Sequence, residues 1–117
     1  MDHRELAAEL FLSYCNCAQA VLEAFSDVTG LEKSFAAKLA SSFGGGMGRM
    51  REVCGAFSGI TLVLGALYGS DDPAKKTALY TDVQALAAEY KARNGRGSMI
   101  CKELLGLKEP EGSPVAS

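Results

Sequence analysis

The chain has 117 residues, a formal net charge of −2 at pH 7 and four cysteines. That length suits one domain, and the interspersed charges exclude the broad basic surface used to bind nucleic acid or anionic membranes. With 48% hydrophobic residues and no tryptophan, the composition favours a helical core of Leu, Ala, Val and Met. The N-terminal residues lack the basic and then apolar segments of a secretory signal, so we expect a cytoplasmic protein, in which static disulfides are the exception.

Three amphipathic helices are predicted in the first 43 residues. Apolar residues at spacings of three and four over 3–12 indicate a helix that ends near Ser13 or Tyr14. Asn16 and Gln19 have the spacing of a capping box, which predicts a second helix from about Cys17 that stops before Gly30. Apolar residues on one side and charged residues on the other predict a third helix over 31–43.

The chain is organised around residues 43–69, which hold most of its glycines and one of its cysteines. Residues 53–70 contain no charged residue but four glycines, at positions 55, 59, 65 and 69. Each glycine costs a helix about 1 kcal/mol relative to alanine, and glycines four apart let another backbone approach closely. A bilayer span needs at least about 18 apolar residues, so this interrupted stretch barely reaches the lower limit. We therefore predict a buried central helix, entered through a flexible turn at residues 44–48.

Two further helices are predicted after the central one. Asp72 as cap and Pro73 at the first helical position predict a helix over 73–93, with Leu79, Val83, Leu86, Ala87 and Tyr90 facing inward. A short helix is predicted over 98–106, with Ser98 as its cap and Gly106 as its end. The expectation is a single all-α domain over residues 1–107, a bundle of about five to six helices, followed by a flexible tail over 108–117.

Three of the four cysteines fall in the first turn of a predicted helix. Cys17, Cys54 and Cys101 would each lie at an N-terminus, where free N–H groups stabilise a thiolate and bring the thiol pKa from ~8.5 toward neutrality. For any single cysteine, we favour the interpretation as a small buried hydrophobe. The Cys15-x-Cys17 pair lacks the spacing of a thioredoxin-type site, and the pattern of three favours thiol chemistry.

Four stretches of the chain resemble a known family. They are NCAQAVL at 16–22, FGGGMG at 43–48, VCGAFSG at 53–59 and CKELLG at 101–106. They are similar to the C_GCAxxG_C_C family, and the resemblance implies a small, helical, cysteine-dependent redox protein whose family cysteines correspond to Cys17, Cys54 and Cys101. The family's last cysteine has no counterpart in residues 107–117, and Cys15 is an additional one. Whether Cys15 replaces the missing thiol in space stays open.

The residues support three alternatives besides an interaction module without chemistry. The first is thiol redox chemistry, in which Cys17 or Cys54 attacks and a second cysteine resolves the intermediate. The second is a zinc or iron–sulfur site with all four cysteines as ligands: Cys15, Cys17, Cys54 and Cys101. The third is an anionic cofactor held by the glycine-rich turn and its arginines: Gly45, Gly46, Arg49 and Arg51. We favour the first, with an unknown redox partner or small-molecule substrate, and leave a homodimer open.

Overall fold

The computed structural model describes residues 2–106 and contains seven α-helices and one short 3₁₀ helix within them. The bounds are α1 (His3–Ser13), α2 (Cys17–Ala24), α3 (Ser26–Thr29), α4 (Lys33–Ala40), η1 (Ser41–Phe43), α5 (Gly55–Tyr68), α6 (Pro73–Arg93) and α7 (Cys101–Leu104). The all-α prediction is confirmed for this part of the chain, where the sole β-type pairing is a bridge between Val53 and Ile100. The tail expected over 108–117 lies outside the described residues.

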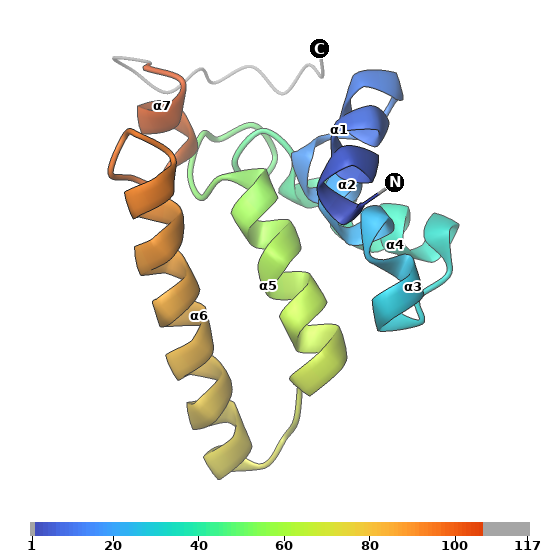
Figure 1. Ribbon diagram of the computed structural model, residues 1–117, viewed down its shortest axis with the longest axis vertical. Helices are drawn as coiled ribbons and strands as arrows, with labels where there is room; N and C mark the ends of the chain where they lie inside the picture. Colours follow the sequence, from blue (N-terminus) through green and yellow to red (C-terminus); the bar gives the residue numbers. More distant parts are fainter. Residues whose placement is uncertain (1, 107–117) are drawn as a thin grey trace.

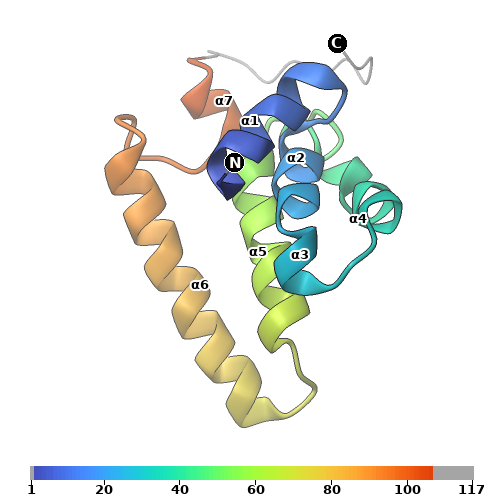
Figure 2. The ribbon, with the colours of Figure 1, turned by 45° about the vertical axis from the view of Figure 1, so that its right-hand side comes forward.

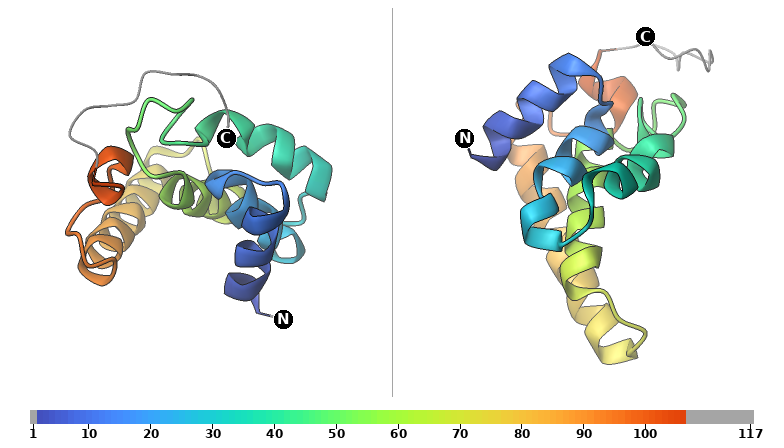
Figure 3. Two further views of the ribbon diagram at one scale, coloured as in Figure 1. Left: turned by 90° about the horizontal axis from the view of Figure 1, so that it is seen from above. Right: turned by 90° about the vertical axis from the view of Figure 1, so that its right-hand side faces the viewer.

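Helix α5 is the middle element of the fold (Figure 1). Helices α2 and α3 pack on one side of it, with α4 packed against α2, and α6 runs back along the other side as the second arm of a helical hairpin (Figure 2). Helix α1 packs on α2, and α7 lies beside the loop that leads into α5 (Figure 3). The arrangement brings the starts of α2, α5 and α7 to the same end of the molecule.

The core lies where α2, α4 and α5 meet. Its buried residues are small or branched: Ala18, Leu22, Ala36, Ala40 and Val63. Three alanines in this group let the helix axes approach closely, because their side chains add little volume between the backbones. The predicted use of α5 as the packing centre is therefore confirmed for its first half, while its last residues, from Gly65 to Tyr68, are exposed.

The helix starts that the sequence predicts most specifically are confirmed. Asn16 accepts a hydrogen bond from the N–H of Gln19 at 2.9 Å, and the Gln19 side chain accepts from the N–H of Asn16 at 3.0 Å. Asp72 caps α6 by accepting from the N–H of Lys75 at 3.3 Å, directly before Pro73. These local bonds satisfy N–H groups that have no partner inside the helix, so their spacing is visible in the sequence.

Three predicted boundaries are wrong. The second predicted helix breaks at Phe25 into α2 and α3, and Gly30 closes only the short α3 in the left-handed conformation. Helix α5 begins at Gly55, because Cys54 before it has non-helical dihedral angles, with φ −54° and ψ 130°. Helix α7 covers only Cys101–Leu104.

Ser98 is not the cap of α7, because it lies two residues before the N-cap Ile100. Its hydroxyl instead accepts from the N–H of Ile100 at 3.0 Å and donates to the carboxylate of Glu103 at 2.7 Å. The Ser98 side chain thus stabilises the turn that leads into α7.

Helix α6 contacts the rest of the fold mainly through α5. None of its residues is fully buried, and Lys76 is partly buried. The five residues predicted to face inward are partly buried as well: Leu79, Val83, Leu86, Ala87 and Tyr90. Among the described residues, no helix combines the length and the apolar character needed to cross a membrane.

Candidate functional site

Three cysteines from distant parts of the sequence gather at one end of α5. Cys17 is the first residue of α2, Cys54 is the N-cap of α5, and Cys101 is the first residue of α7. Their sulfurs are close enough that negative charge on Cys54 or Cys101 raises the pKa of Cys17. All three are free thiols in the structure, with Cys17 and Cys54 partly exposed and Cys101 buried. We refer to these three residues as the thiol cluster.

Glycines on α5 bring Cys17 to the cluster. A Cβ atom added to Gly55 would lie 3.1 Å from Cβ of Cys17, and one added to Gly59 would lie 2.8 Å from Cβ of Val21. Both distances are shorter than ordinary carbon contacts, so α2 could not pack this closely on a helix with side chains at these positions. The two glycines thus allow the predicted close approach. Helix α2 packs on α5 near Cys54, which brings Cys17 to the start of α5.

Backbone pairing brings Cys101 to the cluster. The N–H of Cys54 donates to the carbonyl of Met99 at 2.8 Å, and the N–H of Lys102 donates to the carbonyl of Arg51 at 3.1 Å. The antiparallel bridge between Val53 and Ile100 lies between these bonds. Residues 51–54 and 99–102 therefore run side by side, which holds the start of α7 next to the start of α5.

The loop between η1 and α5 is a compact left-handed segment. Six of its residues have positive φ, including three that are not glycine: Gly45, Gly46, Met47, Gly48, Arg49 and Arg51. Non-glycine residues pay about 1–2 kcal/mol each for this conformation. Position 46 leaves no room for a side chain, because a Cβ added to Gly46 would lie 2.6 Å from Cβ of Cys101. The loop backbone thus forms one wall of the thiol cluster.

Two polar side chains contact sulfurs of the cluster. The hydroxyl of Tyr90 lies 3.2 Å from Sγ of Cys54, and Nη1 of Arg51 donates to Sγ of Cys101 at 3.8 Å. The ring of Tyr90 packs edge-on against Phe57, with centroids 5.5 Å apart. The sequence places Tyr90 correctly on the inner face of α6 but assigns it no chemistry, because nothing local links position 90 to position 54.

The pKa of Cys17 is raised, opposite to the direction expected for a cysteine at a helix start. Burial of the thiol is the largest cause, followed by the charges of Cys54 and Cys101, while a hydrogen bond with the backbone of Cys17 lowers the pKa. Loss of water around the sulfur therefore outweighs the stabilisation that the backbone gives to the thiolate. Burial and the hydrogen bond with Cys54 also raise the pKa of Tyr90, so this phenol keeps its proton across the physiological range.

Cys15 belongs to a different group of side chains. Its thiol donates to Oε2 of Glu23 at 2.6 Å, and the Tyr14 hydroxyl donates to Oε1 at 3.2 Å. Burial and then Glu23 raise the pKa of Cys15 to about 12. A thiol that stays protonated and is engaged by a carboxylate is a poor nucleophile. Cys15 is therefore held as a protonated donor to Glu23.

The residues considered for a metal or an anionic cofactor are only partly brought together. Between residues 2 and 106 no three His, Cys, Asp or Glu side chains are arranged to hold a metal ion. Gly46 is buried and Arg51 is partly buried, both beside Cys101, while a Cβ on Gly45 would lie 2.6 Å from Cγ of Arg49. Of the four residues predicted to bind an anion, Gly46 and Arg51 thus contact Cys101, while Gly45 and Arg49 contact each other.

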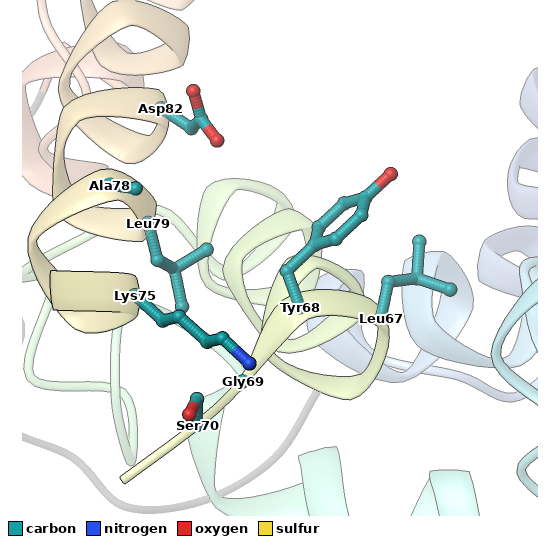
Figure 4. Close-up of a pocket in the computed structure, with 8 residues that line it drawn as sticks. All are labelled: Leu67, Tyr68, Gly69, Ser70, Lys75, Ala78, Leu79 and Asp82. Atoms are coloured by element: carbon teal, nitrogen blue, oxygen red, sulfur yellow. The ribbon is translucent and has the colours of Figure 1, made fainter. Parts of the chain in front are cut away.

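A pocket of about 460 Å³ lies at the opposite end of the α5–α6 hairpin from the cysteines (Figure 4). Leu67 and Tyr68 at the end of α5 face Lys75 and Asp82 on α6 across it. It contains no thiol, so the chemistry of the cluster and this pocket are separate features.

The fold and the thiol cluster define a small all-helical protein in which three free cysteines meet at converging helix starts. The chain belongs to the family described as "Putative redox-active protein (C_GCAxxG_C_C)", which it matches over residues 15–116. Comparisons with curated proteins and with solved structures gave no match. The family resemblance found in the sequence is thereby confirmed.

Proposed function

We propose that the protein exchanges electrons with disulfide substrates through the thiol cluster. The observation that carries this proposal is the meeting of Cys17, Cys54 and Cys101, which come from three separate helices and influence one another electrostatically. Thiol–disulfide exchange needs one thiolate to attack and a second thiol close enough to resolve the mixed disulfide. Isolated buried cysteines would meet neither requirement.

The reaction consists of two exchange steps. A thiolate of the cluster attacks one sulfur of a substrate disulfide, forms a mixed disulfide and releases the other substrate sulfur as a thiolate. A second cysteine then attacks the cluster sulfur of that mixed disulfide and releases the remaining substrate thiolate. The substrate gains two electrons, the two cluster thiols form one intramolecular disulfide, and their two protons supply the two product thiols. An external dithiol reductant restores the cluster.

The test is oxidation of the reduced protein with a low-molecular-weight disulfide under anaerobic conditions, followed by peptide mapping without reduction. We expect one intramolecular disulfide between two cysteines of the cluster, with Cys15 recovered as a thiol. Its midpoint in dithiol redox buffers should fall within the range of thiol oxidoreductases, about −270 to −120 mV. Recovery of mixed disulfides alone, or of a bridge that includes Cys15, would contradict the proposal.

A further inference from the structure

We infer that Tyr90 is a catalytic residue of the thiol cluster: its hydroxyl donates a hydrogen bond to Sγ of Cys54, which makes Cys54 the attacking sulfur and leaves Cys17 to resolve the mixed disulfide. This inference rests on the proposed thiol–disulfide function and assigns a role to each group in it. The distance of 3.2 Å between the Tyr90 hydroxyl and the Cys54 sulfur is the contact that carries it.

The direction of this hydrogen bond follows from the state of the phenol. Either atom could donate when both groups are neutral. Burial of Tyr90 and its contact with Cys54 raise the pKa of the phenol, so the O–H remains a donor when the thiol has lost its proton. Hydrogen bonds to an ionised acceptor are about twice as strong as neutral ones. Tyr90 can therefore donate to the sulfur of Cys54 throughout the attack.

The position of the phenol is held by packing. The Tyr90 ring meets Phe57 of α5 at an interplanar angle of 60°, and Phe57 is itself buried. Edge-on aromatic pairs of this kind fix both ring positions. Since Phe57 follows Cys54 by three residues on the same chain segment, the contact ties the hydroxyl of α6 to the start of α5.

The other two sulfurs are less suited to attack. Cys101 is only 8% exposed, so a substrate disulfide cannot reach it without movement of α7. The pKa of Cys17 is raised by burial and by negative charge on its two neighbours. Cys54 is partly exposed and is the cluster sulfur that the phenol contacts. Access and charge stabilisation thus coincide at Cys54.

The same electrostatics set the order of the steps. While Cys54 is a thiolate, its charge raises the pKa of Cys17 and keeps that thiol protonated. Once Cys54 is part of a neutral mixed disulfide, that charge is gone and Cys17 ionises more readily. The titratable groups that face this pair are Tyr90 on α6, which contacts Cys54 as a neutral phenol, and Cys101 on α7, whose sulfur accepts from Arg51. Cys17 is held next to the start of α5 by the close packing at Gly55.

The first experiment treats the reduced protein with limiting iodoacetamide and maps the alkylated cysteine. We expect Cys54 to react first in the wild type, and Tyr90→Phe to slow its alkylation at pH 7 about fivefold and to move the midpoint of its pH profile upward. Tyr80→Phe is the matched control, because Tyr80 lies on the same helix and is 59% exposed. It should change neither quantity.

Two outcomes would overturn the assignment of Tyr90. One is alkylation of Cys17 before Cys54 in the wild type. The other is a Tyr90→Phe variant whose rate and pH profile for Cys54 equal those of the wild type. A merely structural role predicts a different pattern, in which the variant melts earlier and the buried Cys101 becomes more reactive while the pH midpoint of Cys54 stays constant.

The second experiment uses a chromogenic aryl disulfide. We expect Cys17→Ser to stop at a mixed disulfide on Cys54 and to release one equivalent of aryl thiol, whereas the wild type releases two. An intramolecular disulfide in Cys17→Ser would overturn the resolving role of Cys17. Failure of the wild type to form any intramolecular disulfide would refute the proposed function, while a Tyr90 effect on alkylation would survive it. The two ideas are therefore tested separately.

Discussion

The thiol of Cys15 donates a hydrogen bond of 2.6 Å to Oε2 of Glu23, a side chain that is only 3% exposed. The hydroxyl of Tyr14 donates to the second oxygen of the same carboxyl group. Both donors lie in the connection between α1 and α2, while Glu23 lies in the last turn of α2. The additional cysteine of this chain is therefore a partner of a buried acid, outside the thiol cluster.

Loss of the Cys15 donor should destabilise the fold. In Cys15→Ala, Oε2 of Glu23 stays buried without this hydrogen bond, which typically costs about 1–3 kcal/mol. Cys15→Ser keeps a donor at the same place and should lose less. Urea unfolding of the two variants beside the wild type measures the difference, and equal free energies of unfolding for Ala and Ser would show that the hydrogen bond contributes nothing.

Alkaline pH should weaken this contribution. The folded-state pKa of Cys15 is about 12 against an ordinary value of 9.0, so between these values the unfolded state binds fewer protons than the folded state. The free energy of unfolding therefore falls as pH rises from about 9 toward 12. Because serine does not titrate there, the advantage of the wild type over Cys15→Ser should shrink over this window. A constant difference between pH 8 and pH 11 would contradict the raised pKa.

The sequence predicts those parts of the structure whose causes are local. The capping box of Asn16 and the proline start at Pro73 depend on groups a few residues apart, and both are found where they are expected. The break at Phe25 is missed, since apolar periodicity continues through it while the chain turns toward α4. Helix α7 is shorter than predicted because backbone pairing with residues 51–54 uses the residues before Cys101.

The sequence identifies the cysteines of the site, but it does not identify the groups that surround them. Cys17 and Cys101 share a place at a helix start, which is visible in the sequence. The direction of the Cys17 pKa depends on burial and on two charges from other helices, which only the fold sets. Tyr90 contacts Cys54 across 36 residues, and no local pattern connects them.

Two glycines of α5 should respond to alanine in opposite ways. Gly59→Ala places a Cβ 2.8 Å from Cβ of Val21 and 3.0 Å from the carbonyl of Ala18, so we expect a loss of about 1–3 kcal/mol. Gly65→Ala meets nothing within 4 Å and should gain about 0.5–1 kcal/mol from helix propensity. Thermal unfolding of both variants measures this. Destabilisation of similar size by both would mean that close packing against α2 does not require Gly59.

Asn16 should contribute more to the free energy of unfolding than an ordinary helix cap does. Besides capping α2, its side-chain amide donates to the carbonyl of Ser41 at 3.0 Å and lies where a Cβ on Gly44 would clash. Asn16→Ala removes the cap and this link, so we expect a loss of about 2 kcal/mol. Asn16→Asp keeps the cap but turns a carboxylate oxygen toward the Ser41 carbonyl, and should recover only part of it. Full recovery in urea unfolding would show that the link to Ser41 contributes nothing.

The loop wall at Gly46 should decide whether Cys101 stays protected. Gly46 has φ +76°, and a Cβ on it would lie 2.6 Å from Cβ of Cys101 and 2.7 Å from the backbone nitrogen of Glu52. Gly46→Ala must therefore move the loop or α7. This movement should raise the alkylation rate of Cys101 several-fold above the rate in a variant that has backbone strain alone.

Gly48→Ala isolates that strain, because Gly48 has φ +57° and a Cβ there meets nothing within 4 Å. It should cost about 1–2 kcal/mol while leaving Cys101 as slow to react as in the wild type. Alkylation rates measured by peptide mapping at matched stability, set by added urea, separate the two causes. Equal exposure of Cys101 in both variants would mean that general loosening of the loop, and no contact specific to Gly46, controls access to this sulfur.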